Sequence, residues 1–260
     1  MKKKLLDVLC MSEKRKQVLL LLRNEAKDME TLLNSIDTTR QALLPQMKIL
    51  QEHYLIEHYD DMYELTTIGK LIVEEMKPLL DTTEVLDIDI NYWGTHSIDL
   101  IPPHLLKRIY EINDCVIIEP SLLEMYEINK DFLQLATKSR SLFFIFTFMH
   151  PTFPFILQQF IAENKNILVI INKELLQKIE EEWSDLLKKL IADKKVKFYL
   201  HQGDIGLLSL SLSDCCFVLR LLPKSKFSNK QIISRNPEAC KWCEDIYNYY
   251  LNNSTLITEI

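Results

Sequence analysis

The stretch IDTTRQALLPQMKILQEHYLIEHYDDMYELTTIGK, residues 36–70, decides how the N-terminal part of the chain folds. Apolar residues recur in its first half at helical spacing, which predicts an amphipathic helix whose apolar face packs in a core. These residues are Leu43, Met47, Leu50 and Tyr54. The second half, LIEHYDDMYELT, predicts two strands joined at Asp60-Asp61. The stretch therefore predicts a helix followed directly by a β-hairpin.

The start of this helix carries two opposing signals. Thr38, with Gln41 three residues later, forms a capping-box pattern that predicts a helix start. Pro45 lies beyond the first turn, where a proline removes one backbone hydrogen bond and costs about 3 kcal/mol. We therefore expect the helix either to kink at Pro45 or to begin nearer Leu43.

The flanking segments predict further helices. SEKRKQVLLLL has a cap signal at Ser12, DMETLLNSI has one at Asp28, and TTIGKLIVEEM resumes a helix after the hairpin. Three helices, a hairpin and a closing helix are the outline of an α+β winged helix-turn-helix domain, which we assign to residues 1–77. A shift in pattern around Pro78 predicts a connector over residues 78–90.

Residues 91–260 alternate strand-like and helix-like segments. The candidate strands are CVIIE (115–119), SLFFIFTFM (141–149), NILVIIN (166–172) and VKFYL (196–200), with two adjacent strands within 205–222 joined at Ser213-Asp214. Their continuous apolar character is typical of a sheet that is covered on both faces. We therefore expect a C-terminal α/β domain with a mostly parallel sheet flanked by helices.

Charge and motifs limit the possible functions. The chain has a net charge of −6, but residues 1–77 hold 12 Lys and Arg against 13 Asp and Glu, a net of only −1. A domain of this charge can bind DNA if its cations share one face. The chain lacks the GxGxxG, GxxxxGK[ST], GxSxG and HxK patterns. We expect no enzyme activity, no cofactor and no metal site.

The outward face of the helix in residues 36–70 carries the candidate DNA contacts. Arginine and glutamine match the edges of guanine and adenine, and lysine suits phosphate. The alternative is a solvated helix face. The candidates for contact with double-stranded DNA are Thr38, Thr39, Arg40, Gln41, Leu44 and Lys48, with Lys14 and Arg15 near the N-terminus and Tyr63 in the hairpin.

The motifs resemble known families. QMKILQEHYLI and YELTTIG are similar to the recognition helix and the wing of ArsR-like winged helices. YWGTHSIDLIPPHLLKRIYEI, HPTFPFIL and ACKWCEDIYNYYLNNS extend the resemblance over nearly the full chain, to the archaeal methanogenesis-regulator family. This resemblance implies a homodimeric transcriptional regulator of a methanogenic archaeon, with a C-terminal domain that senses a signal.

The sequence departs from the family pattern at several positions. Tyr54 stands where a glycine usually follows the recognition helix, and a left-handed conformation there would cost roughly 1–2 kcal/mol. Cys243 stands where the family has a small residue or glycine. Asp60 and Asp61 place negative charge at the wing tip, which would repel phosphate.

Two groups in the C-terminal domain are candidates for the signal site. An effector pocket could be lined by Trp93, His150, Tyr199, His201 and Trp242, although aromatic residues more often pack in a core. His150 follows a predicted strand, where ligands bind in open α/β sheets. Cys240 and Cys243 have redox-type spacing in CKWC, and the alternative for them is a structural role as buried thiols.

The start of the chain lacks a convincing secretory signal, and its apolar runs are too short to span a bilayer. We therefore expect a cytoplasmic protein with reduced cysteines and no membrane partner. Three functions remain open: a regulator that responds to an unknown small molecule, a regulator that responds to cysteine oxidation, and an enzyme of unknown activity in the α/β domain.

Overall fold

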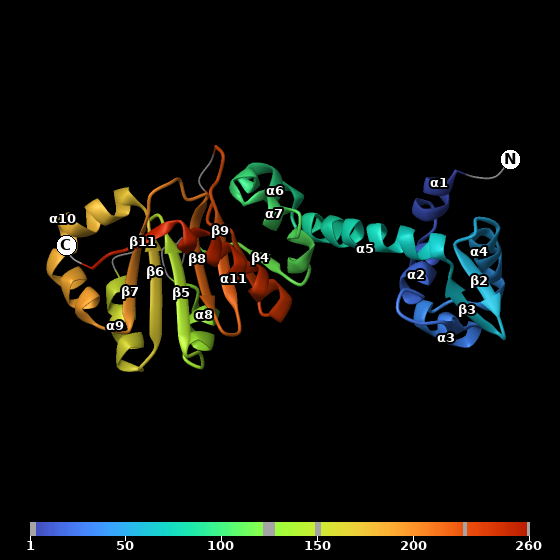
Figure 1. Ribbon diagram of the computed structural model, residues 1–260, viewed down its shortest axis with the longest axis horizontal. Helices are drawn as coiled ribbons and strands as arrows, with labels where there is room; N and C mark the ends of the chain where they lie inside the picture. Colours follow the sequence, from blue (N-terminus) through green and yellow to red (C-terminus); the bar gives the residue numbers. More distant parts are fainter. Residues whose placement is uncertain (1–3, 122–127, 149–151, 226–227, 259–260) are drawn as a thin grey trace. The chain divides into compact units, whose positions relative to one another are not determined.

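The computed structural model describes residues 4–121, 128–148, 152–225 and 228–258 (Figure 1). The chain forms two compact units, Met1–Leu80 and Asp81–Ile260. Helix α5 (Thr67–Asp87) begins in the first unit and ends in the second. Residues 78–87, which were expected to form a connector, are therefore helical.

The N-terminal unit has the element order expected of a winged helix. Its helices are α1 (Leu5–Cys10), α2 (Glu13–Leu21), α3 (Met29–Ile36), α4 (Arg40–Glu52) and the start of α5. Its strands are β1 (Lys27–Asp28), β2 (Ile56–Tyr59) and β3 (Met62–Leu65), which form an antiparallel sheet in the order β1-β3-β2. Ser12 and Asp28 cap α2 and α3 as predicted. The sequence reading missed the short strand β1.

The start of helix α4 decides between the two alternatives, a helix that passes Pro45 and a helix that begins near Leu43. Thr39 is its N-cap, and the hydroxyl of Thr39 accepts a hydrogen bond from the backbone N–H of Ala42 at 3.4 Å. The third helical residue is thus Ala42 and not Gln41, so the predicted capping box is displaced by one position. The helix continues through Pro45 to Glu52. A start near Leu43 is therefore wrong.

Leu43, Met47 and Leu50 are buried in the core of the N-terminal unit, as their spacing predicted. Tyr54 is not part of that face, because 66% of it is exposed. It lies just past the helix in a left-handed conformation, with φ of 56°. The N–H of Tyr54 bonds the carbonyl of Gln51, and the N–H of Leu55 bonds that of Leu50. This is a Schellman motif with tyrosine where glycine is usual.

The hairpin turns at Asp60 and Asp61, as predicted. Both residues have positive φ, 46° and 62°. Positive φ at both central positions defines a type I′ turn, whose twist matches that of the two flanking strands.

The residues of the YELTTIG segment, 63–69, are explained by how they pack. Tyr63 and Leu65 are buried, and the hydroxyl of Thr66 accepts a hydrogen bond from the N–H of Gly69 at 3.0 Å. A Cβ atom on residue 69 would lie 2.0 Å from the carbonyl oxygen of Leu55. Only glycine therefore lets α5 start so close to the chain that enters the hairpin.

The C-terminal unit is built on one eight-stranded sheet with the order β11-β7-β6-β5-β8-β9-β10-β4. Its strands are β4 (Val116–Ile118), β5 (Ser141–Phe146), β6 (Asn166–Ile171), β7 (Val196–His201), β8 (Leu207–Ser213), β9 (Phe217–Leu221), β10 (Gln231–Ser234) and β11 (Ser254–Leu256). Its helices are α6 (Ile90–Thr95), α7 (Pro103–Leu106), α8 (Lys130–Ala136), α9 (Phe153–Ala162), α10 (Lys173–Ala192) and α11 (Pro237–Asn252), with short 3₁₀ turns at Ile98–Leu100 and Ile109–Ile112.

The prediction of a mostly parallel sheet is wrong. In the described part of the sheet, the pairs β5–β6 and β6–β7 are the only parallel ones, while β8, β9, β10, β4 and β11 pair antiparallel with their neighbours. The reason lies in the connections. Helices α9 and α10 cross between the parallel strands, whereas β8 and β9 are joined by a short turn, which allows only antiparallel pairing.

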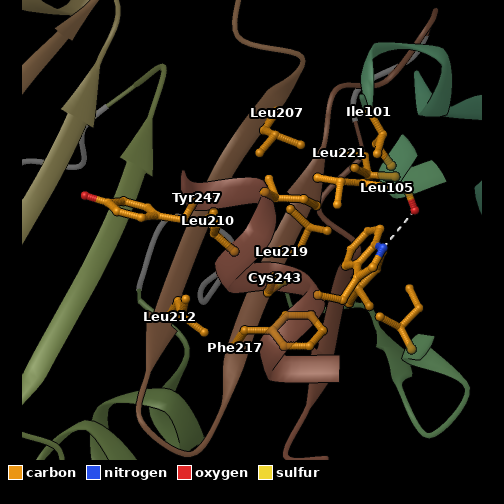
Figure 2. Close-up of a cluster of buried hydrophobic side chains, with 14 of the residues drawn as sticks. Ile101, Leu105, Leu207, Leu210, Leu212, Phe217, Leu219, Leu221, Cys243 and Tyr247 are labelled. Carbon is orange, nitrogen blue, oxygen red and sulfur yellow. Dashed lines mark hydrogen bonds between the residues drawn. The ribbon is translucent and has the colours of Figure 1, made fainter. Parts of the chain in front are cut away.

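Both faces of this sheet are covered, as the apolar strands predicted. Helix α11 packs on one face, where Leu210, Leu219 and Cys243 are buried (Figure 2). The indole N–H of Trp242 donates a hydrogen bond to the carbonyl of Leu105 at 2.9 Å in this layer. Apolar residues of α8, α9 and α10 pack on the other face. Within the described residues, no helix is both long enough and apolar enough to cross a bilayer.

Candidate nucleic-acid interface

One face of α4 carries most of the predicted DNA contacts. Arg40, Gln41, Leu44 and Lys48 are all exposed, and their spacing along the helix places them on the face opposite the buried Leu43, Met47 and Leu50. Three exposed residues that were not among the predicted contacts, Pro45, Gln51 and Glu52, extend this face, and Glu52 adds a negative charge at its end. Helical spacing identifies all three. We call Arg40, Gln41, Leu44, Pro45, Lys48, Gln51 and Glu52 the exposed face of α4.

Helix α4 is held in place by a buried arginine. Arg15 is only 4% exposed, and its Nη1 donates a hydrogen bond to Oε1 of Gln46 at 2.7 Å. Its other guanidinium nitrogens bond the backbone carbonyls of Val8 and Asp7. The prediction that Arg15 faces DNA is therefore wrong. Its guanidinium ties α1, α2 and α4 together instead.

Tyr63 is also inside the unit. It lies on β3, is 7% exposed, and its ring stacks on His58 with centroids 4.3 Å apart. Burial raises the pKa of its hydroxyl, and the nearby charge of Arg40 partly opposes this. Tyr63 therefore supports the wing and the start of α4, and its side chain is not presented to a partner.

The remaining candidate DNA contacts of the N-terminal unit differ in how exposed their side chains are. Lys14 and Thr38 are half-buried, and Thr39 is exposed but its hydroxyl caps α4. The wing tip is exposed at Tyr59, Asp60 and Asp61, so its outer surface is acidic.

The structure does not gather the predicted effector residues around one cavity. Trp93 and Trp242 are core residues whose indole N–H groups donate to the carbonyls of Val85 and Leu105, each at 2.9 Å. Nδ1 of the buried His201 lies 3.1 Å from the hydroxyl of Ser254 in the neighbouring strand, and Tyr199 is half-buried. His150 lies outside the described residues. A pocket lined by the two tryptophans is therefore wrong.

Two cavities of the C-terminal unit lie elsewhere. One, of about 290 Å³, is lined by Ile118, Glu119, Pro120, Ser121, Ile128, Asn129, Lys130, Asp131 and Gln231. The other, of about 210 Å³, is lined by Asn91, Tyr92, Thr95, His96, Pro223, Ser225, Ser228 and Lys230. The sequence reading named none of these residues as effector contacts.

The CKWC cysteines lie on α11 in surroundings that suppress the thiolate. Cys243 is fully buried, and burial raises its pKa well above the usual value. Burial also raises the pKa of the half-buried Cys240 to about 11. A thiol in such a site reacts slowly, because the thiolate is the nucleophile. In the part of the chain that the structure describes, no three side chains of His, Cys, Asp or Glu are grouped to hold a metal ion.

Comparison with solved structures gives only distant similarity. Reduced HlyU from Vibrio cholerae is 22% identical over 29% of this chain and 83% of its own, with a TM-score of 0.27. TrmBL2, an archaeal chromatin protein whose structure is described as showing a novel mode of DNA binding, is 9% identical over 94% of each chain, with a TM-score of 0.43.

Sequence families give a closer assignment. The middle domain of the methanogenesis regulatory protein FilR1 matches residues 125–253, and the HVO_A0261 N-terminal domain matches residues 4–87. FilR1 of Methanothrix harundinacea is 23% identical over 139 residues, which are 54% of this chain and 31% of that protein. The match thus spans about a third of that relative's length. Through these matches the predicted resemblance to the methanogenesis-regulator family is confirmed: the C-terminal part of the chain is similar to the FilR1 middle domain.

Proposed function

We propose that this chain is a transcriptional regulator that binds double-stranded DNA through an ArsR-like winged helix. The observation that carries the proposal is the exposed face of α4, where Arg40, Gln41, Leu44 and Lys48 are presented on a helix anchored by buried residues. A helix fits the major groove of B-DNA, and a fixed helix keeps its side chains in register with the bases.

The side chains on this face suit distinct parts of DNA. Arg40 can donate two hydrogen bonds to a guanine, and Gln41 can pair with an adenine edge. Leu44 offers an apolar contact for a thymine methyl group, and Lys48 offers a charge for a phosphate. Lys14 supplies a second candidate phosphate contact. The acidic turn at Asp60 and Asp61 makes the wing tip a poor phosphate contact.

We also propose that the regulator acts as a homodimer. Apolar side chains are exposed on α1 and on the part of α5 in the N-terminal unit. They are Leu5, Leu6, Ile68, Leu71 and Leu79, and Leu71 is 63% exposed. Two copies would present two copies of α4 to half-sites about 34–36 Å apart on a palindromic site. Sedimentation equilibrium of the wild type, Leu71→Glu and the control Lys70→Glu tests this. If this surface forms the dimer, the wild type and Lys70→Glu are dimers and Leu71→Glu is a monomer. A wild type that is itself a monomer contradicts the proposal.

The similarity to FilR1 supports a role in a methanogenic archaeon, in the cytoplasm, with the C-terminal unit reading a signal. A small molecule is the favoured signal, because two cavities of the C-terminal unit are lined by both polar and apolar side chains. A signal carried by Cys240 and Cys243 has less support because both thiols have raised pKa values. An enzyme of the α/β unit stays a third possibility, and no observation favours a particular reaction.

The decisive experiment is selection of bound sequences from random double-stranded DNA, followed by fluorescence anisotropy on the selected site. We expect a palindromic site whose affinity falls as salt rises. Arg40→Ala should weaken binding by roughly 1–3 kcal/mol and relax the preference at one base pair. Arg235→Ala, an exposed arginine of the C-terminal unit, is the matched control and should bind as the wild type does. Failure to enrich any sequence at low salt, or equal affinity of Arg40→Ala, would contradict the proposal.

A further inference from the structure

The 210 Å³ cavity of the C-terminal unit has a lining of mixed character. Tyr92 and Pro223 contribute apolar surface, and six other lining residues carry a hydrogen-bonding or charged side chain: Asn91, Thr95, His96, Ser225, Ser228 and Lys230. Such a lining suits a small molecule that has both an apolar part and polar groups. The chemistry of the occupant follows from the two titratable residues, His96 and Lys230.

His96 presents a hydrogen-bond acceptor to the cavity. The residue is only 3% exposed, and its ring stacks on Tyr92 with centroids 3.9 Å apart. Its Nδ1 lies 2.7 Å from the carbonyl oxygen of Tyr92, so Nδ1 carries the proton and donates it to that carbonyl. Among the described residues, Nε2 has no hydrogen-bond partner. Nε2 is therefore the ring nitrogen left for a molecule in the cavity.

The protonation state of His96 fits this role. Burial lowers the pKa of His96, and the positive charge of Lys230 lowers it further, against the opposing effects of the Tyr92 carbonyl and Asp89. The ring is therefore neutral at neutral pH, and the lone pair of Nε2 is available. A bound group must donate a hydrogen bond there, as a hydroxyl does.

Lys230 presents a cation to the same cavity. Its ammonium group forms an ion pair with Asp89, and its side chain stays 30% exposed. An ammonium group has three protons, so Asp89 leaves donors for a second acceptor. Because Asp89 balances the charge of Lys230, an anionic group is held here by the remaining ammonium protons and the neighbouring hydroxyls, in competition with Asp89.

The walls of the cavity are fixed by backbone contacts. His96 forms an isolated antiparallel bridge with Pro223, and the N–H of Lys224 bonds the carbonyl of Thr95 at 2.9 Å. In the same helix, the hydroxyl of the buried Tyr92 accepts a hydrogen bond from the N–H of Leu221. These contacts hold the His96 wall of the cavity in place before any ligand arrives, which reduces the entropy lost on binding.

The cavity is also linked to the end of α5. Asp89, the partner of Lys230, caps α6 by accepting a hydrogen bond from the N–H of Tyr92 at 2.9 Å. The neighbouring Trp93 donates its indole N–H to the carbonyl of Val85 in α5. A ligand that draws Lys230 away from Asp89 therefore removes the charge partner of the residue that caps α6, two residues after α5 ends.

We propose that this cavity binds a small hydroxylated anion, with the anionic group on Lys230 and a hydroxyl donating to Nε2 of His96. We further propose that this anion is the signal read by the C-terminal unit, a step that rests on the proposed regulatory function. Carboxylates and phosphate esters share the required chemistry, and the test separates them.

The binding test uses the full chain without DNA and four probes. Glycerate and glycerol 3-phosphate carry both groups, propionate lacks the hydroxyls, and methyl glycerate lacks the charge. Titration followed by calorimetry should show that glycerate or glycerol 3-phosphate binds at least tenfold more tightly than the two defective probes. In ¹⁵N spectra of the histidine rings, the Nε2 signal of His96 should shift on binding. The proposal is wrong if neither hydroxylated anion binds.

Variants assign the binding to this cavity. His96→Phe and Lys230→Met should each abolish binding, while His104→Phe and Lys107→Met, at exposed positions of the same unit, should retain it. Unchanged affinity in His96→Phe or Lys230→Met would overturn the proposal. If His96→Phe does not fold, the Nε2 shift in the wild type decides, because an anion bound elsewhere leaves that signal unmoved.

A second measurement separates the site from its role. The anion that binds is added to the chain on its selected DNA site, and the DNA affinity is compared with that of Lys230→Met. A change in the wild type only supports the signalling role. Binding of the anion without any change in DNA affinity overturns that role and leaves the site intact. A chain that binds the anion but no DNA contradicts the regulator function instead.

Discussion

The Nη1 atom of Arg15 lies 2.7 Å from Oε1 of Gln46, and this contact joins the first turn of α2 to the centre of α4. Arg15→Met should destabilise the N-terminal unit by about 2 kcal/mol, because it removes charged hydrogen bonds and leaves buried carbonyls without a donor. Hydrogen exchange of amides in residues 40–52 measures the loss. Lys14→Met, one residue away on α2, should leave the exchange unchanged. If Arg15→Met exchanges as slowly as the wild type, the anchoring role is wrong.

Lys14, in contrast to Arg15, should contribute to DNA binding and not to the stability of the N-terminal unit. Lys14→Met should weaken binding to all sequences about equally and reduce the slope of log affinity against log salt by about 1, as expected for one lost phosphate contact. Anisotropy at several salt concentrations gives the slope. The same slope in wild type and variant would show that Lys14 lies away from the DNA.

Tyr54 is held in a left-handed conformation at the end of α4. Tyr54→Gly should stabilise the N-terminal unit by roughly 1 kcal/mol, because glycine adopts positive φ without a steric penalty. Thermal unfolding monitored by calorimetry tests this. Tyr59→Gly, an exposed tyrosine on β2 without positive φ, should destabilise the unit. Equal effects of the two substitutions would contradict the prediction.

The hydroxyl of Tyr247 is buried on the sheet and has no hydrogen-bond partner within the described residues. Tyr247→Phe should therefore stabilise the C-terminal unit, by about 1 kcal/mol, since the variant no longer buries an unpaired hydroxyl. Tyr250→Phe is the matched control, because the hydroxyl of Tyr250 accepts a hydrogen bond from the N–H of Gly206 at 3.1 Å. The control should lose stability in urea unfolding. A destabilised Tyr247→Phe would reveal a partner for the hydroxyl.

The cysteines of α11 should resist modification at neutral pH. Burial raises the pKa of Cys240 to about 11, so its thiolate is scarce at pH 7 and increases about tenfold for each pH unit until the pKa is reached. Alkylation by iodoacetamide, followed by mass spectrometry between pH 7 and pH 9, should modify the exposed Cys10 and Cys215 first. Fast modification of Cys240 at pH 7, or a Cys240–Cys243 disulfide under mild oxidant, would favour the redox hypothesis.

The exposed face of α4 could be predicted from the sequence because its signal is local. Helical spacing alone separates Leu43, Met47 and Leu50 from Arg40 and Lys48. The burial of Arg15 could not be predicted, because it depends on Gln46, 31 residues away, and on two backbone carbonyls. The sequence Lys14-Arg15-Lys16 is the same whether the Arg15 side chain faces solvent or bonds buried carbonyls, so the sequence alone does not distinguish the two cases.

The C-terminal unit was predicted less well for a related reason. The strands β5, β6 and β7 and the helices between them have strong local patterns, so their existence and order could be predicted. The antiparallel pairing of β8 with β9 follows from the short turn between them, but the placement of β8 beside β5 and of β10 beside β9 depends on pairing between distant segments. The strands β10 and β11 are also too short to stand out. His96 gave no local signal either, because its role depends on Lys230 and on a bridge to Pro223.

Among the residues that the structure describes, the non-glycine positions with positive φ are Asp37, Tyr54, Asp60, Asp61 and Asn164, while none of the four glycines has positive φ. Each such position is a site where a better-suited residue could be introduced. Because gains at distant sites add, a heat-resistant form of the protein could combine glycine substitutions at Asp37, Tyr54 and Asn164. None of the three belongs to the exposed face of α4 or lines the cavity at His96. The thermal stability of the protein can thus be raised by substitutions that leave the exposed face of α4 and the cavity at His96 unchanged.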